Sequence, residues 1–335
     1  MIRPADHPPV ACRRLGVLVI NLGTPDAPDA PAVRRYLAEF LSDRRVIEIP
    51  PIAWQPILHG IILRTRPKKS AHAYKQVWTD QGSPLAAITA RQAKALRRDL
   101  GDGVMVEWAM RYGNPGIGAA IERMKTAGCE RILAAALYPQ YCAATTASAN
   151  DAVFGALAAM RWQPALRTLP PYHDDPLYIG ALKDSIERQL AALDFTPARL
   201  LLSFHGMPQR TLHLGDPYHC HCRKTARLLG ERLSLTVDTA FQSRFGRAKW
   251  LEPATDKVLA AYPADGVTKI AIAAPGFSAD CIETIEELGI RGRDSFIAAG
   301  GTHFARLDCL NDSPEGSVML QRIMRRELAG WLPPT

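Results

Sequence analysis

A histidine at the end of an apolar run is the residue best placed to do chemistry. His205 follows the run 200–204 and precedes Gly206. In open α/β sheets, ligands bind beyond the carboxyl ends of the strands. An imidazole there is mostly neutral near pH 7 and can bind a metal or accept a proton. The alternative is a core histidine hydrogen-bonded to backbone, but the position at a strand end favours the functional interpretation.

Four carboxylates, three of them weighed here for chemistry, lie in a predicted helix at 280–288. Asp280 is a natural N-cap, and that role accounts for it fully. Glu283 and Glu287 are four residues apart on one face, where like charges repel unless a proton or cation separates them. We therefore predict Glu283 as a proton acceptor or metal ligand, with Asp280 and Glu287 as secondary acids. One histidine with one or two carboxylates suits a transient divalent cation such as Fe²⁺.

A second group of soft ligands lies at the start of another predicted helix. It consists of His219, Cys220, His221 and Cys222. Four such residues in a row raise the prospect of a metal or iron–sulfur site. No second C-x₂-C or H-x₃-H pair accompanies them, which favours a polar helix start instead.

Short apolar runs alternate with amphipathic segments along the whole chain. The runs predict strands at 15–22, 104–111, 131–138, 165–169, 199–205, 235–241, 269–275 and 303–309. Helices are expected at 31–42, 83–101, 114–128, 145–160, 176–193, 220–232, 254–262, 280–288 and 316–331. This alternation is typical of α/β proteins with buried parallel sheets.

The eight strands divide into four and four about the Pro-rich segment 169–172. We predict an N-terminal α/β domain at 14–170, a C-terminal α/β domain at 171–312, and a helix at 313–335 packing back on the first domain.

Composition limits the classes of protein that the chain can belong to. It has 335 residues, 47% of them hydrophobic, and 41 Lys and Arg against 33 acids, for a net charge of +8. No stretch approaches the roughly 18 apolar residues of a membrane span. Arg13-Arg14 and the run 15–20 resemble a twin-arginine signal, but the run is too short and is better interpreted as a strand. Seven irregularly spaced cysteines favour a reducing compartment.

Several enzyme signatures are missing. The sequence contains no G-x-x-x-x-G-K-[ST] loop, no G-x-G-x-x-G turn after the first strand, no G-x-S-x-G elbow and no H-E-x-x-H pair. Nucleotide-dependent and acyl-transfer chemistry are therefore disfavoured.

The segment 46–69 combines apolar residues with a basic end. Between residues 34 and 69 there are eight Lys or Arg and three acids. The plain interpretation is two core pieces and a solvated turn. The alternative is an exposed apolar lip with a basic collar, suited to a greasy anionic ligand or an anionic bilayer surface.

Eleven motifs, in order over about residues 15–311, make the chain resemble the ferrochelatase family, whose members insert Fe²⁺ into a porphyrin. They are Asn21-Leu22-Gly23-Thr24-Pro25, Arg66-Pro67-Lys68, Gly82-Ser83-Pro84-Leu85, Met110-Arg111-Tyr112-Gly113, Tyr138-Pro139-Gln140-Tyr141, Ser203-Phe204-His205-Gly206-Met207-Pro208, Gly215-Asp216-Pro217-Tyr218, Phe241-Gln242-Ser243-Arg244, Trp250-Leu251-Glu252-Pro253, 275–284 (PGFSADCIET) and Cys309-Leu310-Asn311.

The resemblance implies two Rossmann-like, chelatase-type domains, each with a four-stranded, mainly parallel sheet flanked by helices and with a porphyrin cleft between them. It implies that His205 and Glu283 handle the metal and accept protons. The residues expected to contact porphyrin are Leu22, Arg111, Tyr112, Tyr138, Trp250 and Phe277. Cys281 stands where some relatives have His, which bears on metal preference.

The implied reaction joins protoporphyrin IX and Fe²⁺ into protohaem with release of two protons. A coproporphyrin-specific chelatase and a non-catalytic porphyrin or haem carrier are the alternatives, and Leu22, at a variable position, leaves the porphyrin open. No cofactor beyond substrate Fe²⁺ is expected, and no [2Fe–2S] cluster, because the C-terminal cysteines that ligate one in some relatives are missing. We expect a cytoplasmic protein without nucleic-acid or obligate protein partners, in contact with membranes at most peripherally.

Overall fold

The computed structural model describes residues 14–246 and 248–332. Within these residues no helix is both long and apolar enough to cross a bilayer. Arg13 lies outside the described residues, whereas Arg14 and the run 15–20 belong to the first strand, as predicted.

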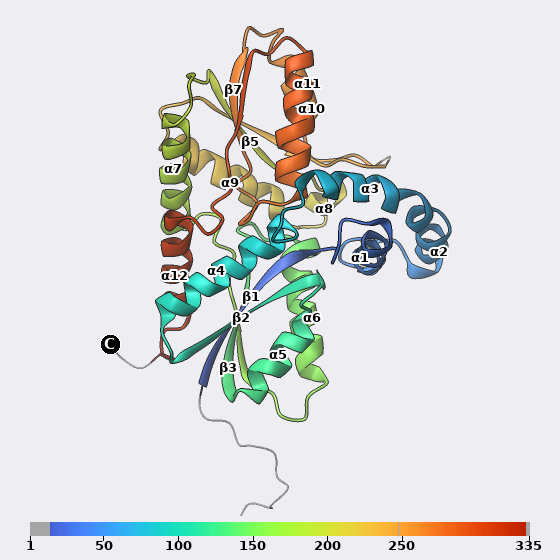
Figure 1. Cartoon of the computed structure of the whole chain (residues 1–335), viewed down its shortest axis with the longest axis vertical. Helices are drawn as coiled ribbons and strands as arrows, with labels where there is room; N and C mark the ends of the chain where they lie inside the picture. Colours follow the sequence, from blue (N-terminus) through green and yellow to red (C-terminus); the bar gives the residue numbers. More distant parts are fainter. Residues whose placement is uncertain (1–13, 247, 333–335) are drawn as a thin grey trace, which may run out of the picture.

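Two separate four-stranded sheets form the framework, one above the other in Figure 1. The first has the order β2-β1-β3-β4 and the second β6-β5-β7-β8, with every neighbouring pair parallel. The strands are β1 (Arg14–Thr24), β2 (Val104–Gly113), β3 (Cys129–Ala136), β4 (Ala165–Thr168), β5 (Arg199–His205), β6 (Val237–Gln242), β7 (Lys269–Ala273) and β8 (His303–Arg306). The predicted α/β class and the division into four and four strands are confirmed.

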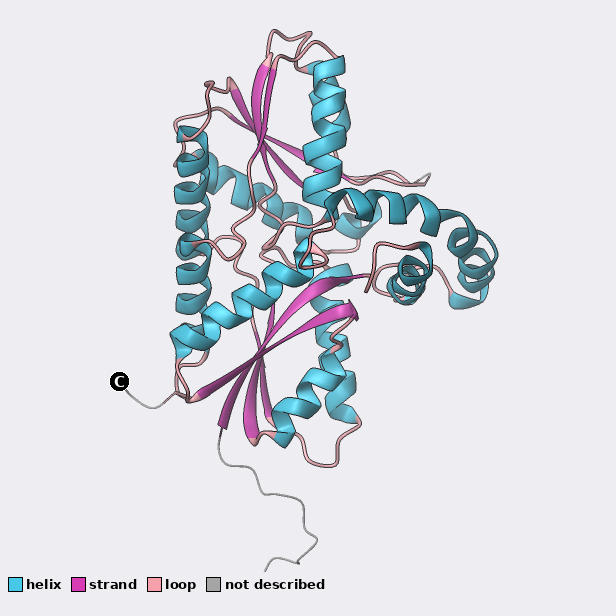
Figure 2. Cartoon of the chain, viewed as in Figure 1, coloured by secondary structure: helices cyan, strands magenta, loops and turns pink. Residues whose placement is uncertain are grey.

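Helices cover the faces of each sheet (Figure 2). Those of the first half are α1 (Ala30–Ser42), α2 (Pro51–Ile57), α3 (Leu63–Val77), α4 (Pro84–Leu100), α5 (Ile117–Thr126) and α6 (Ser148–Ala158). Those of the second half are α7 (Pro176–Ala191), α8 (Gln209–His213), α9 (Tyr218–Gly230), α10 (Thr255–Ala261), α11 (Arg293–Ala298) and α12 (Pro314–Glu327). Three π-helical segments complete the set: η1 (Leu58–Ile62), η2 (Ala143–Ala147) and η3 (Glu283–Gly292).

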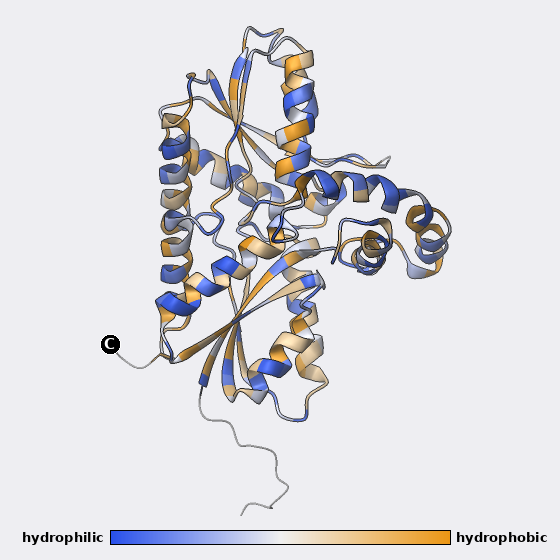
Figure 3. Ribbon diagram, viewed as in Figure 1, coloured by the Kyte–Doolittle hydropathy of each residue, from blue (hydrophilic) through white to orange (hydrophobic). Residues whose placement is uncertain are grey.

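The continuous apolar runs form strands because both of their faces are buried. In β1, Val17 and Val19 pack in the core beside α4, whereas Leu18 and Ile20 pack beside α5 and α6, and all four have no exposed surface. A parallel sheet covered on both sides therefore needs no polar alternation. Figure 3 shows the resulting contrast with α7 and α12, where hydrophilic and hydrophobic residues alternate along the helix.

The C-terminal helix contacts both halves. α12 packs against α4 and α7, and Arg325 and Gln321 donate to the carbonyl of Asp99 at the end of α4. Arg326 pairs with Asp175 at the start of α7. The predicted domain boundaries stay a prediction, but these contacts tie the last helix to elements of both sheets.

The segment 46–69 is mostly helical: α2, η1 and α3 run through Pro56 and Pro67 and project together to one side of the first sheet (Figure 1). Ile52, Ile57 and Ile61 on this segment are exposed, and the apolar lip stays a prediction. One local prediction was wrong. The segment 280–288 does not form an α-helix capped by Asp280. It becomes π-helical from Glu283, and no side chain caps its first turn.

Candidate functional site

His205 ends β5, where its ring is held by the next residue. Its Nδ1 lies 2.7 Å from the carbonyl oxygen of Gly206. Because a carbonyl can only accept, Nδ1 must carry the proton, which leaves the lone pair of Nε2 free. Metal-binding histidines commonly have this arrangement, with one ring nitrogen donating to a carbonyl and the other binding the metal. The half-buried imidazole is therefore set up as a metal ligand or base.

Glu283 starts the π-helix η3 beside the end of β6. The side chain of Gln242 donates to the backbone carbonyl of Glu283 at 2.9 Å. Gln242 is also the register partner of His205 in the β5–β6 pair. One buried glutamine therefore contacts the backbone beside each of the two residues predicted to handle the metal, and Glu283 stands on a π-helical segment of the kind often found at functional sites.

Glu287 is engaged by the residue that follows Gln242. Ser243, at a positive φ of 63°, donates its N–H to Oε1 of Glu287 at 2.9 Å and its hydroxyl to Oε2 at 2.6 Å. Glu286 is buried and accepts hydrogen bonds from Nε and Nη2 of Arg291, at 2.8 and 2.9 Å. Both acids therefore fasten η3, whereas Glu283 lies beside the buried thiol of Cys281, whose pKa is raised by burial and then by Glu283.

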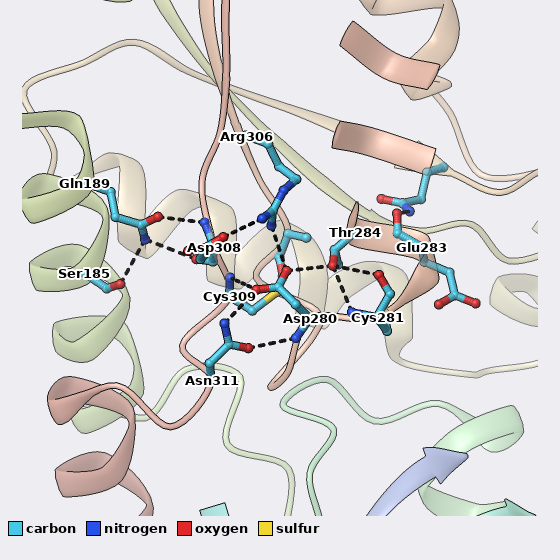
Figure 4. A network of polar contacts seen from close by, with 12 residues as sticks. Ser185, Gln189, Asp280, Cys281, Glu283, Thr284, Arg306, Asp308, Cys309 and Asn311 are labelled. Carbon is cyan, nitrogen blue, oxygen red and sulfur yellow. Dashed lines mark hydrogen bonds and ion pairs between the residues drawn. The ribbon is translucent and has the colours of Figure 1, made fainter. Parts of the chain in front are cut away.

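Asp280 lies at the centre of a polar network that differs from a helix cap (Figure 4). Its Oδ1 accepts from Thr284 at 2.7 Å and from Arg306 at 2.8 Å. Its Oδ2 accepts from the side chain of Asn311 at 2.6 Å and from the amide of Cys309 at 3.2 Å. Four donors saturate this buried carboxylate, so it orients the 278–284 turn. The side chain of Glu283 points away from the network (Figure 4).

Two of the apolar residues predicted to contact porphyrin come together between the two sheets. Leu22, after the middle of β1, and Phe277, after β7, both pack on a cluster that contains Met110 of β2 and the buried Cys281. The carboxyl ends of strands from both sheets therefore converge. Trp250 lies next to Gly206, the residue after His205, because a Cβ on Gly206 would be 3.3 Å from its indole ring.

Arg111 and Tyr112 are tied to an acid that the sequence analysis overlooked. Arg111 contacts Asp43 at 2.5 Å and Ser148 at 2.7 Å, and the Tyr112 hydroxyl donates to Asp43 at 2.8 Å. Burial raises the pKa of Asp43, but its polar neighbours outweigh burial, so the pKa lies below its ordinary value. The neighbours are the hydrogen-bond donors Ser148, the Arg45 amide and Tyr112, and the charge of Arg111. Asp43 directly follows α1, so the local sequence marked it only as a residue at a helix end and not as a partner of Arg111.

These two residues differ in what they can touch. Tyr112 has no exposed surface, so it acts on a ligand only through its neighbours. The Arg111 side chain retains 19% exposure. Tyr138 has a buried hydroxyl with no protein partner in the described part of the chain, and burial raises its pKa. An unpaired buried hydroxyl in this position is a ready hydrogen-bonding group for a ligand.

Two buried tyrosines of the first half also lie near Glu283. The pKa of Tyr36 in α1 is raised well above its ordinary value by burial and then by Tyr74, Glu283, Tyr112 and Tyr138. The rings of Tyr36 and Tyr74 meet edge to face, with centroids 6.5 Å apart. α1, α3 and η3 therefore converge here, and sequence patterns offered no signal for either tyrosine beyond a helix core position.

The side chains of His219, Cys220, His221 and Cys222 do not converge. His219 stacks near Phe241, Cys220 is exposed and Cys222 is fully buried. His221 stacks on His173 at 3.6 Å and accepts the N–H of Tyr141. No group of three His, Cys, Asp or Glu side chains able to hold a metal occurs in residues 14–246 and 248–332. The four residues form the first turn of α9, as the favoured interpretation as a helix start predicted.

A cavity of about 650 Å³ lies beside the Asp280 network, but neither His205 nor Glu283 lines it. Its lining includes Trp78, Arg91, Asp280, Ile285 and Arg306. It borders the Asp280 network on the side of the α3–α4 connection. We therefore locate the candidate site by the converging side chains and not by this cavity.

The fold is that of a chelatase. The structure of SirB from Bacillus subtilis with Fe³⁺ aligns with a TM-score of 0.53 over 95% of this chain and 96% of that chain, at 14% identity. A sirohydrochlorin chelatase SirB from Bacillus subtilis subspecies spizizenii in complex with cobalt also aligns at 0.53, over 95% of this chain and 97% of that chain, at 11% identity. At these identities the likeness extends to the fold alone.

Sequence similarity is much stronger and specifies the family. The family model described as Ferrochelatase matches residues 14–328. The ferrochelatase of Rhizobium etli is 52% identical over 99% of this chain and 98% of its own length, and that of Rhizobium meliloti is 53% identical over 98% of each. The chain belongs to the ferrochelatase family.

Proposed function

We propose that this protein inserts Fe²⁺ into protoporphyrin IX to form protohaem with release of two protons. The observation that best supports this is the placement of His205 at the end of β5, with Nδ1 donating to a carbonyl and Nε2 free, while its register partner Gln242 donates to the backbone carbonyl of Glu283. Fe²⁺ enters as a substrate, and the proposal needs no other cofactor.

The reaction requires groups of two kinds at the centre of the macrocycle. Two pyrrole N–H protons must leave as the nitrogen–iron bonds form. The ring thereby gains two negative charges, which balance the two positive charges of Fe²⁺. We assign Nε2 of His205 and the carboxylate of Glu283 to metal delivery and proton acceptance together, since both chemistries suit an imidazole and a carboxylate.

The surrounding residues would bind and bend the ring. Leu22, Phe277 and Trp250 offer apolar and aromatic surface, and binding energy from such contacts can distort a substrate toward its reactive shape. Arg111 would attract a propionate, although Asp43 already neutralises much of its charge. Tyr138 would supply a hydrogen-bonding hydroxyl.

The test is anaerobic metalation by purified His205→Ala and Glu283→Gln, followed by absorbance. We expect each variant to lose at least 100-fold in kcat while binding porphyrin with nearly the native Kd, because both groups act at the ring centre. His213→Ala, at an exposed position on α8, is the matched control. Normal metalation by His205→Ala would refute the assignment. Competition between protoporphyrin and coproporphyrin separates the two substrates, and porphyrin binding without metalation by the native protein would identify a carrier.

The α2–η1–α3 segment supports a second, finer part of the proposal: a cytoplasmic protein that touches anionic membranes peripherally. Ile52 is 89% exposed and Ile61 57% exposed. Exposed basic residues follow in α3, among them Arg64 and Lys68. Apolar side chains beside basic ones are typical of surfaces that insert shallowly into anionic bilayers.

Sedimentation with lipid vesicles tests this contact. We expect binding to vesicles with 30% phosphatidylserine but not to pure phosphatidylcholine, and weaker binding for Ile52→Asp and at high salt. Val318→Asp, a change at a 48% exposed apolar residue on α12, is the control. Equal sedimentation of native protein and Ile52→Asp would contradict the proposed contact.

A further inference from the structure

Gln242 contacts the backbones at both predicted catalytic residues without reaching the reacting centre itself. It ends β6, is 2% exposed, and pairs in register with His205. Its role was not anticipated from sequence, where it was merely a polar residue at a strand end. Its backbone and its side chain each make a separate contact.

The backbone of Gln242 acts on the histidine. Its carbonyl accepts the N–H of Gly206 at 2.7 Å, and the carbonyl of Gly206 in turn lies 2.7 Å from Nδ1 of His205. The approach is so close that a Cβ on Gly206 would lie 2.4 Å from the Gln242 oxygen. The orientation of the imidazole is thus set through Gly206 by the end of β6.

The side chain of Gln242 acts on the glutamate. Its Oε1 accepts from the Ser203 hydroxyl at 2.8 Å, and its Nε2 donates to the carbonyl of Glu283 at 2.9 Å. The hydroxyl of Ser203 also lies 2.8 Å from that of Thr255. Because the carbonyl of Glu283, the first residue of η3, can only accept, the amide must direct its donor end at it, and Ser203 donates to the other end.

We propose that Gln242 is a positioning residue for metal insertion, holding His205 and Glu283 at a set separation across the ends of β5 and η3. The inference rests on the proposed roles of those two residues. A misplacement of about 1 Å at a reacting group can cost about 100-fold in rate. A glutamine with both ends of its amide paired between buried elements resists such a shift.

The first test replaces Gln242 by Met, which keeps the length of the side chain and removes both hydrogen bonds. We expect kcat for Fe²⁺ insertion to fall 10- to 100-fold, with the Kd for protoporphyrin, measured by fluorescence quenching, within twofold of native. Gln140→Met is the matched control: Gln140 is also 2% exposed and donates to a hydroxyl, that of Thr225. Its kcat should stay within threefold of native.

A double-variant cycle separates positioning from a general structural effect. If Gln242 acts by placing the Glu283 carboxylate, Gln242→Met should cost less than threefold in a Glu283→Gln background, where that carboxylate is gone. A purely structural role would cost the same factor in both backgrounds and would overturn the inference.

A smaller change covers the case in which Gln242→Met does not fold. Ser203→Ala removes the hydroxyl that donates to Oε1 of Gln242, and we expect a 3- to 10-fold loss in kcat, against less than twofold for Thr255→Val. Native-like kcat for Ser203→Ala, with His205→Ala and Glu283→Gln inactive, would overturn the inference alone. Full activity of the latter two variants would remove the proposed function on which it rests.

Discussion

Removing the carboxylate of Asp280 should destabilise the protein strongly. The Asp280 side chain is 5% exposed and that of its partner Arg306 is 22% exposed, with 2.8 Å between Nη1 and Oδ1. Although burial lowers it, the charges of Asp280 and Asp308 raise the pKa of Arg306 above its ordinary value. Asp280→Ala would leave this cation half-compensated and three further donors, on Thr284, Cys309 and Asn311, without their acceptor.

The magnitude follows from the burial of the pair. Breaking a buried ion pair from one side costs about 3–5 kcal/mol. The unfolding entropy is about 2.1 cal/mol/K per residue, so a chain of 335 residues that unfolds as one unit has about 0.7 kcal/mol/K. The expected fall in Tm is therefore about 4–7 °C, measured by calorimetry or circular dichroism.

Two companion variants test the reasoning. Asp308→Asn alters the other acid that pairs with Arg306. The Asp308 side chain is 60% exposed, and exposed pairs contribute about 0–1 kcal/mol, so Tm should fall by less than about 1.5 °C. Asp280→Ala combined with Arg306→Met removes the stranded charge and should recover part of the loss. The reasoning is refuted if Asp280→Ala unfolds within 1 °C of the native protein, or if the double variant is less stable than Asp280→Ala.

Two further predictions concern pH and backbone packing. Burial and then the adjacent His221 lower the pKa of His173 to about 4, from its ordinary value of 6.5. As the pH drops from about 6.5 toward 4, the unfolded chain therefore binds a proton at this histidine before the folded chain does. Tm should fall over this pH range. His173→Asn should flatten that slope, and parallel Tm–pH curves would contradict the assignment. Gly206→Ala should lower kcat at least tenfold in the metalation assay, because its Cβ would meet the Gln242 carbonyl at 2.4 Å, whereas Gly118→Ala, with open space around it, should not. Equal activities would show that the close approach at β5 is dispensable.

Much of the architecture could be predicted because it depends on local patterns. A strand buried on both faces must be apolar at every position, so the runs around Val17 and Leu201 were recognisable from sequence alone. The ordered motifs that resemble ferrochelatases, including those around His205 and Glu283, likewise needed no structure, and the family match over residues 14–328 confirms that resemblance.

Other features depend on residues that are distant in sequence. Asp43 contacts Arg111 across 68 positions, and Asp280 contacts Asn311 across 31. No periodicity or spacing encodes such partners, because they form only when separate strands and helices pack together. For the same reason Asp280 was interpreted as a helix cap.

The sequence by itself determined the fold class, the family and the identity of the histidine and glutamate that we assign to the chemistry. Only the tertiary structure decided how these two are held: the free Nε2 of His205, the π-helical start at Glu283 and the glutamine between them. It also decided that the side chains of 219–222 diverge, since consecutive helical residues point to different sides. Residue types are written along the chain, whereas geometry arises from contacts between its distant parts.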